Sequence, residues 1–200
     1  MNAPTIEFFW DAASPYSYLA ATQIDALAGR VGAAVRWRPF LLGKVFEACG
    51  NRMPAAVPAK GKYLFQDLQL WSRFYGVPLR FPKKFPTNSL LAQRVACAAE
   101  PGPSGPQLAR AVMRAYWADG QDIEDAAILA RLCDGLGLPG AGLIEAAGQQ
   151  PVKDLLRANT EEAVRRGAFG APSFFVGERM FWGNDRLPLM EAMLAGRLAA

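Results

Sequence analysis

Apolar and polar positions alternate along this chain in a way that separates short strands from helices. The apolar run over residues 5–10 predicts a buried strand, and apolar residues alternating with Arg36 and Arg38 predict a second strand over 34–41. Between these strands, residues 16–30 carry apolar side chains at helical spacing. Strand, helix and strand at this spacing predict a βαβ unit with parallel strands and a right-handed crossover.

The rest of the chain is mostly helical until its last thirty residues or so, which return to strands. Helices are predicted over 60–76, 88–99, 106–117, 124–136, 142–147 and 152–166, with a proline-broken connector over 78–86. A hairpin of strands 173–176 and 180–182 follows, and a helix over 186–198 closes the chain. This order predicts an α/β, thioredoxin-like fold. We expect residues 1–42 and 152–200 to form the thioredoxin-like domain and residues 43–151 an inserted helical domain.

Composition limits the classes of function. Two hundred residues with 52% hydrophobic content can bury a sizeable core. The net charge of +4 is mild and the basic residues are scattered, so nucleic-acid binding is not indicated, while a basic pocket for a small anion remains open. No apolar run reaches the roughly 18 residues of a membrane span, and no signal peptide is visible, so we expect no membrane partner and a cytoplasmic protein.

Cysteine and histidine usage narrows the chemistry further. The cysteines Cys49, Cys97 and Cys133 form no Cys-x-x-Cys and no zinc pattern, which indicates reduced thiols and no metal site. The chain contains no histidine. A Ser-His-Asp triad, a Cys-His pair and an imidazole acid or base are therefore excluded. Hydroxyls, carboxylates, Lys, Arg, backbone dipoles or a reactive group brought from outside must do the chemistry.

The segment Phe-Phe-Trp-Asp-Ala-Ala-Ser-Pro-Tyr-Ser-Tyr-Leu over 8–19 carries the first candidate site. Ser14 occupies an N-cap position and Pro15 the first helical position, where a helix begins abruptly after a strand. Free N–H groups and the helix dipole favour an anion such as a thiolate, carboxylate or phosphate there. Ser14 has a second interpretation as a helix cap only. The two roles are compatible, because a hydroxyl can accept and donate at once.

The segment Phe-Gly-Ala-Pro-Ser over 169–173 carries the second candidate, immediately before a predicted strand. A cis bond before Pro172 would turn the backbone of Ala171 outward, leaving its N–H and C=O free for an extended peptide-like ligand. An ordinary trans proline at the start of a strand is the alternative.

These two segments together resemble the DsbA-like branch of the thioredoxin superfamily, and within it the 2-hydroxychromene-2-carboxylate isomerases and the related kappa-class glutathione transferases. The resemblance covers essentially the whole chain. It rests on Ser-Pro-Tyr-Ser-Tyr over 14–18, Arg-Pro-Phe-Leu-Leu-Gly over 38–43, Gly-Asn over 50–51, Val-Pro-Ala-Lys over 57–60, Gly-Ala-Phe-Gly-Ala-Pro over 167–172 and Phe-Trp-Gly-Asn-Asp-Arg over 181–186. In this family a serine replaces the Cys-x-x-Cys, and glutathione supplies the sulfur.

The resemblance implies a set of glutathione-binding residues, with Ser14 as the catalytic hydroxyl that lowers the pKa of the glutathione thiol. It implies that Ala171, before a cis Pro172, pairs with the cysteinyl backbone, and that Asn184 and Asp185 hold the γ-glutamyl end. Asn51 and Lys60 match positions near the glycyl end or the substrate. Taken alone, the Asn184-Asp185 pair is typical of a helix cap and Lys60 of a solvated surface.

Substrate-binding residues are predicted from the motifs that carry the resemblance. Lys44 follows the motif over 38–43 and, with Asn51, is our candidate for the substrate carboxylate, while Arg38 is a weaker one. Aromatic residues that either line a substrate pocket or belong to the core are Trp10, Phe46, Phe65 and Trp71.

The resemblance implies glutathione-dependent isomerisation of 2-hydroxychromene-2-carboxylate to trans-o-hydroxybenzylidenepyruvate, a step of naphthalene-type aromatic catabolism, through addition and elimination of the glutathione thiolate. It also implies a homodimer acting on a small aromatic carboxylate. Two alternatives stay open: a kappa-like glutathione transferase, and a non-catalytic glutathione- or peptide-binding module.

Overall fold

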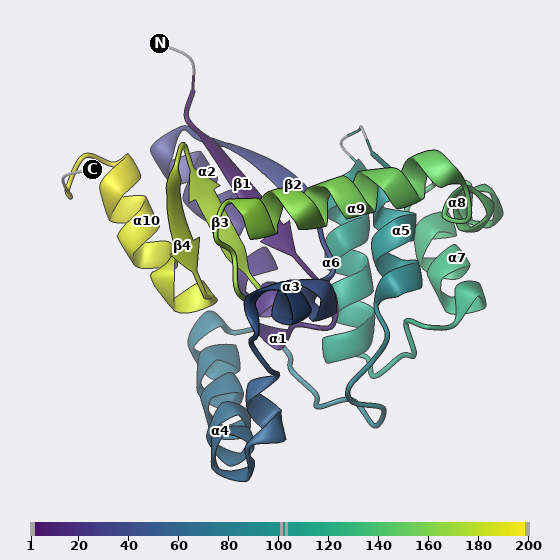
Figure 1. Cartoon of the computed structure of the whole chain (residues 1–200), viewed down its shortest axis with the longest axis horizontal. Coiled ribbons are helices and arrows are strands. Elements are labelled where there is room, and N and C mark those ends of the chain that lie inside the picture. The colour runs from purple at the N-terminus through teal and green to yellow at the C-terminus, as the bar shows by residue number, and fades with distance from the viewer. Residues whose placement is uncertain (1–2, 101, 103, 199–200) are drawn as a thin grey trace.

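A four-stranded mixed sheet forms the centre of the computed structural model, which describes residues 3–100, 102 and 104–198. The strands β1 (Thr5–Trp10), β2 (Ala34–Pro39), β3 (Ser173–Val176) and β4 (Arg179–Trp182) lie in the order β2-β1-β3-β4 (Figure 1). β1 pairs parallel with β2 and antiparallel with β3, and β3 pairs antiparallel with β4. The predicted parallel pair and the predicted hairpin are therefore both confirmed.

Both faces of this sheet are covered, which explains why β1 is almost continuously apolar. Phe8 lies on one face, with its ring 4.8 Å from the rings of both Trp37 and Phe174. Phe9 lies on the other face and packs against Phe40 and Phe175 in a second, smaller core cluster. A strand that is buried on both faces loses the apolar-polar alternation of a half-exposed strand.

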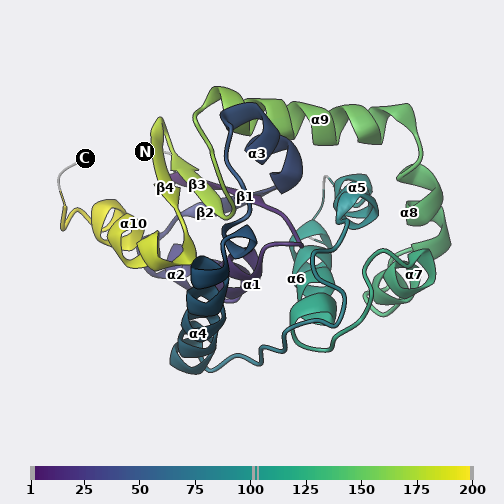
Figure 2. The same ribbon diagram turned by 60° about the horizontal axis from the view of Figure 1, so that its bottom comes forward.

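Ten α-helices and two 3₁₀ turns surround the sheet within the described residues. They are α1 (Pro15–Ala21), α2 (Ile24–Val31), α3 (Leu42–Cys49), η1 (Pro54–Ala56), α4 (Pro58–Tyr75), α5 (Leu90–Ala98), α6 (Ser104–Trp117), α7 (Ala126–Asp134), α8 (Gly140–Ala146), α9 (Gln150–Arg165), η2 (Asn184–Arg186) and α10 (Leu187–Leu194). α5 to α8 gather on one side of the sheet, α9 bridges back from them, and α4 projects away from the body (Figures 1 and 2). No helix among these residues combines the length and apolarity that crossing a membrane requires.

The helix predicted over 16–30 is wrong as a single element, because the chain forms two helices there. α1 ends at Ala21, and the N–H groups of Thr22 and Gln23 donate to carbonyls three residues back. The Thr22 hydroxyl also donates to the Leu19 carbonyl at 2.7 Å. A threonine hydroxyl that takes a carbonyl from the helical ladder bends or ends the helix. The helix beginning at Ser14 therefore has only seven residues.

Other helices differ less from the prediction. α3 was not predicted, whereas the helix predicted over 124–136 is α7. Asp125 is its N-cap, and the Asp125 carboxylate accepts the Ala127 N–H at 2.8 Å. The remaining bounds differ from the prediction by at most four residues. The predicted division at residues 42 and 151 stays a prediction; one large core cluster runs from the sheet into α5, α6 and α7.

Candidate functional site

The turn after β1 places Ser14 through a dense set of hydrogen bonds. Asp11 accepts the Ala13 N–H at 2.9 Å with one carboxylate oxygen and the Leu42 N–H at 2.8 Å with the other. The Ser14 N–H donates to the Asp11 carbonyl at 2.9 Å. Burial raises the pKa of Asp11, while hydrogen bonds from Ser89, Ala13 and Leu42 act in the opposite direction. The carboxylate thus fixes both the turn and the start of α3.

Side chains from two helices, α5 and α6, also form hydrogen bonds with this turn. The fully buried Gln93 side chain on α5 accepts the Ala12 N–H at 3.2 Å and donates to the Trp10 and Phe40 carbonyls at 2.8 and 3.0 Å. The indole of Trp117 on α6 donates to the Ala12 carbonyl at 2.8 Å. These bonds satisfy backbone groups that strand ends leave unpaired in the core.

Ser14 caps α1 and also contacts the second predicted segment. Its hydroxyl oxygen accepts the Ser17 N–H at 3.2 Å, and the hydroxyl donates to the Ala171 carbonyl at 3.0 Å. The hydroxyl therefore caps the helix and donates at the same time, while anion binding by Ser14 stays a prediction. The dipole behind it belongs to a short helix. The peptide bond between Ala171 and Pro172 is cis. The Ala171 N–H has no acceptor among the described residues.

A cavity of about 1100 Å³ opens over Ser14 and Ala171. One side, which we call the sheet wall, is formed by residues 14–16, 170–171 and 182–185. The opposite side, which we call the helical wall, comes from α3, η1, α4 and the loop between α3 and η1. The predicted residues that line this one cavity are Ser14, Asn51, Lys60, Ala171, Asn184 and Asp185. Pro172 is buried behind it, and its carbonyl accepts the Gly183 N–H at 3.0 Å.

The two walls hold these residues differently. On the sheet wall Asn184 is buried beside Tyr75, and the exposed carboxylate of Asp185 pairs with Arg186 at 2.5 Å. On the helical wall Asn51 and Lys60 are exposed. The Asn51 amide reaches across and donates to the Phe169 carbonyl at 2.9 Å. It is the one cavity-lining residue of the helical wall, among those described, whose side chain bonds the segment before Pro172.

Lys44 differs from its predicted position. It pairs with Glu47 at 2.7 Å and lines a separate cavity on the other side of α3. Leu42 and Phe46, four residues apart on the helix, face the cavity that holds Ser14, so Lys44 between them points away. The structure does not bring Lys44 together with Ser14.

The aromatic candidates and Arg38 also divide into residues that line the Ser14 cavity and residues that lie elsewhere. Phe46 and Trp71 line the cavity, whereas Trp10 is a core residue with 1% exposure. Phe65 packs against Phe81 outside the cavity. Arg38 bonds Glu7 at 2.7 Å and Asn159 at 2.8 Å on the far face of the sheet, and therefore has a structural role.

Sequence reasoning missed three charged or phenolic groups in the cavity. The Tyr16 hydroxyl donates to Asp67 on α4 at 2.7 Å. Burial raises the pKa of Tyr16, and the Asp67 carboxylate raises it further, so the phenol stays a proton donor. Arg52, next to Asn51, is exposed at the rim, and no described carboxylate lies within ion-pair distance of it. The sequence could have pointed to Arg52, because it directly follows the Gly-Asn motif. No local sequence pattern pairs residues 16 and 67.

Comparisons with known proteins agree with this geometry. A family model described as a DSBA-like thioredoxin domain matches residues 5–195. A 2-hydroxychromene-2-carboxylate isomerase of Sphingobium xenophagum is 35% identical over 195 residues, covering 95% of this chain and 97% of the relative. The human glutathione S-transferase kappa 1 is 29% identical, covering 95% of this chain and 90% of the relative.

A solved structure of a 2-hydroxychromene-2-carboxylate isomerase superposes with a TM-score of 0.88 at 29% identity, covering 96% of this chain and 95% of that one. The cis Ala171-Pro172 bond and the Ser14 turn of this chain thus lie in a thioredoxin-like frame that extends over nearly its whole length. The chain belongs to the 2-hydroxychromene-2-carboxylate isomerase family, within the proteins that carry the DsbA-like thioredoxin domain.

Proposed function

We propose that this protein is a glutathione-dependent isomerase that interconverts 2-hydroxychromene-2-carboxylate and trans-o-hydroxybenzylidenepyruvate. The observation that carries the proposal is the buried Ser14 hydroxyl, which meets the backbone of Ala171 in a cavity large enough for a tripeptide and a small aromatic acid. Relatives that carry the isomerase name at 30–35% identity over almost the whole chain support the substrate.

The cavity residues fit glutathione group by group. The Ala171 N–H, without an acceptor among the described residues, suits an extended peptide carbonyl. Asp185 offers a carboxylate for the γ-glutamyl ammonium, and Asn184 lies beside it. Lys60 and Asn51 on the helical wall suit the glycyl carboxylate. When bound, glutathione supplies a thiolate nucleophile that can add to a conjugated double bond and leave again.

Ser14 then controls the charge on that sulfur. Its hydroxyl must turn from the Ala171 carbonyl to donate to a sulfur atom, while its oxygen keeps the Ser17 N–H. A hydrogen bond to the charged form of a group favours that form, so Ser14 lowers the pKa of the thiol. Because α1 is only seven residues long, we assign this effect to the hydroxyl rather than to the helix dipole.

Arg52 is our candidate for the substrate carboxylate in place of Lys44. It lines the Ser14 cavity, and it lacks a described carboxylate partner. An arginine can bind a carboxylate through two parallel hydrogen bonds. Phe46 and Trp71 offer apolar surface for the aromatic ring. Tyr16, whose single hydroxyl proton goes to Asp67, offers its oxygen as an acceptor for a hydroxyl group of the substrate.

The experiment is a glutathione-dependent absorbance assay on 2-hydroxychromene-2-carboxylate with the wild type and Ser14→Ala. Loss of one aimed donor predicts a fall in kcat of about 10²–10³-fold. Glutathione affinity, measured by calorimetry, should change little, because Ala171, Asn184 and Asp185 remain. Full turnover by the Ser14→Ala variant, or wild-type turnover without glutathione, would refute the proposal.

A kappa-like glutathione transferase is the second candidate, favoured by relatives of that name at 27–29% identity over a similar share of the chain. Chlorodinitrobenzene separates the two, since conjugation of this electrophile without any isomerisation would assign the chain to the transferases. A protein that binds glutathione without turnover of either compound would be a binding module.

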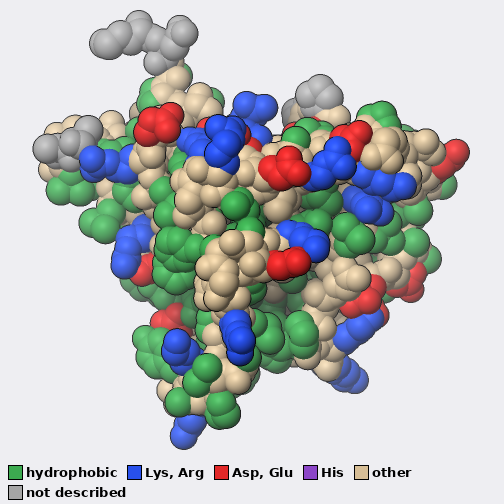
Figure 3. Space-filling view, viewed as in Figure 1, with side chains coloured by type: hydrophobic (Ala, Val, Ile, Leu, Met, Phe, Trp, Pro, Cys, Tyr) green, Lys and Arg blue, Asp and Glu red, His purple; other side chains and the backbone are tan. Residues whose placement is uncertain are grey.

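We further propose a homodimer working in the cytosol, where reduced glutathione is available. α4 exposes Leu70 and Phe74, with 63% and 79% of their surface accessible, and hydrophobic side chains gather around this projecting helix (Figure 3). An exposed apolar patch of this kind is typical of an interaction surface. Light scattering on the wild type and on Phe74→Ser tests this, with a dimer expected for the first and a weakened dimer for the second.

A further inference from the structure

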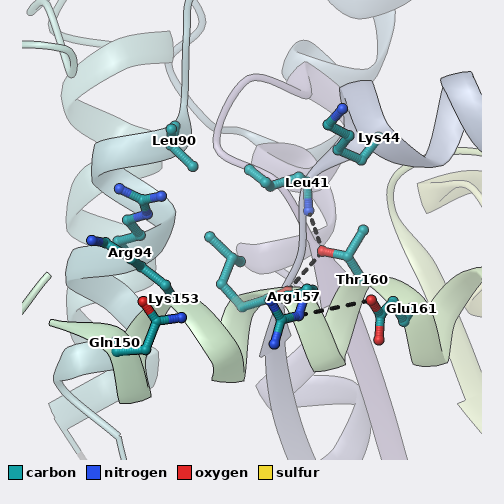
Figure 4. A pocket seen from close by; sticks show the side chains of 10 residues that line it. Leu41, Lys44, Leu90, Arg94, Gln150, Lys153, Arg157, Thr160 and Glu161 are labelled. Carbon is teal, nitrogen blue, oxygen red and sulfur yellow. Dashed lines mark hydrogen bonds and ion pairs between the residues drawn. The ribbon is translucent and has the colours of Figure 1, made fainter. Parts of the chain in front are cut away.

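A second cavity, of about 500 Å³, lies on the other side of α3 from Ser14, between α3, α5 and α9. Leu41, Leu90 and Leu156 give it an apolar surface. The charged residues around this surface are four cations, Lys44, Arg94, Lys153 and Arg157, and one carboxylate, Glu161 (Figure 4). Neither composition nor the proposed reaction accounts for such an excess of positive charge in one cavity.

Two of the four cations already have partners. Lys44 pairs with Glu47 at 2.7 Å, and Arg157 pairs with Asp154 at 2.8 Å. These side chains are mostly exposed, where ion pairs form and break at little cost. They therefore form the rim of the cavity rather than its binding group.

Arg94 and Lys153 are the unusual pair. Both are half-buried, and no carboxylate of the described residues lies within ion-pair distance of either. The Nε atom of Arg94 is buried and has no hydrogen-bond acceptor among the described residues. Arg94 extends from α5 and Lys153 from α9 at the same end of the cavity (Figure 4). Two cations at one end of a cavity, with no described carboxylate beside them, repel each other, and an anion between them removes that repulsion.

The first turn of α9 adds to this positive region. The sixteen-residue helix begins at Gln150, which lines the cavity, and its N-cap Gln149 makes no side-chain capping hydrogen bond. First-turn N–H groups that lack a cap favour a negative charge nearby. Here they lie at the same cavity as Arg94, which has no ion-pair partner in the part of the chain that the structure describes.

We propose that this cavity is a second binding site, which takes a small organic carboxylate. The carboxylate group lies between Arg94 and Lys153, and the apolar body of the ligand covers the three leucines. An inorganic anion would satisfy the two cations but leave the apolar surface in water. A site of this volume accommodates a single-ring acid. The proposal does not depend on the reaction at Ser14.

The test is a titration of the full-length protein with sodium benzoate, followed residue by residue in proton-nitrogen correlation spectra. Saturable shifts are expected at Leu90, Arg94 and Lys153. Arg94→Met and Lys153→Met should each weaken this response about ten- to hundredfold, because each removes one charge-assisted hydrogen bond. Arg131→Met, which removes one charge from the exposed face of α7, should leave it unchanged.

Two further titrations distinguish which chemical groups of the ligand the site recognises. Sodium sulfate at equal ionic strength, and benzyl alcohol, should each give a much weaker response at the same residues. Any one of three results would overturn the proposal. Benzoate could shift only residues around Ser14, or sulfate could saturate the site as well as benzoate does. The third such result is that both folded methionine variants bind benzoate like the wild type. Circular dichroism of each variant verifies that it is folded, and the second methionine variant serves if the first is not.

Discussion

The sheet wall and the helical wall of the cavity are built on different principles. At Ser14 the sheet wall is buried and held by many hydrogen bonds, because Asp11, Gln93 and Trp117 all bond the turn that leads to Ser14. On the helical wall, Arg52 and Lys60 are exposed and make few side-chain bonds. A preorganised group favours one fixed chemical task, whereas exposed side chains of a loop and of the projecting helix α4 can adapt to the ligand. We therefore assign the thiol to the first wall and the choice of substrate to the second.

The largest effect should come from breaking the support of the sheet wall at Gln93. Gln93→Leu keeps the volume but leaves the Phe40 carbonyl and the Ala12 N–H unpaired in the core, and the Trp10 carbonyl keeps only the Phe40 N–H. We expect the free energy of unfolding to fall by about 3 kcal/mol, measured by chemical denaturation. Asn51→Leu on the helical wall should lower it by less than about 1 kcal/mol. Equal losses for both variants would remove the distinction between the walls.

The next effect concerns Arg52 and substrate choice. Arg52→Met should raise the KM for the hydroxychromene carboxylate about tenfold, since it removes a charge-assisted bond, and should leave kcat for neutral chlorodinitrobenzene within about twofold. Lys44→Met is the matched control, because it also removes one positive charge, but from the second cavity rather than from the Ser14 cavity. It should change neither this KM nor this kcat. A rise in KM with Lys44→Met alone would restore our original prediction for that residue.

The sequence predicted the sheet wall better than the helical wall, for a physical reason. The apolar run of β1 and the Ser14-Pro15 helix start are local signals, and the structure has both. The local pattern left the bond before Pro172 open between cis and trans; the resemblance implied the cis bond that the structure has. Lys44 was misplaced because α3 was not predicted, and each residue of a helix turns the next by about 100°. The roles of Gln93 and Asp67 depend on contacts across 83 and 51 residues, which no local pattern encodes.

The smallest predicted effect lies on the far face of the sheet, at Glu7. Burial raises the pKa of Glu7, but hydrogen bonds and charge from Arg166 and Arg38 more than offset this, so its pKa is lowered below 4.5. A lowered carboxyl pKa stabilises the fold above the unfolded value, and this contribution disappears as the pH falls through the folded value. Glu7→Gln should therefore cost about 1 kcal/mol near pH 7 and less in acid. A difference independent of pH would contradict the assignment.

The most direct measurement of the central claim is the ionisation of the glutathione thiol on the protein. Ultraviolet absorbance of the thiolate, titrated against pH with bound glutathione, should give an apparent thiol pKa near neutrality for the wild type. In Ser14→Ala it should rise by about one unit or more, equal to about 1.4 kcal/mol of lost stabilisation of the thiolate. An unchanged pKa in that variant, with glutathione still bound, would contradict the role that we assign to Ser14.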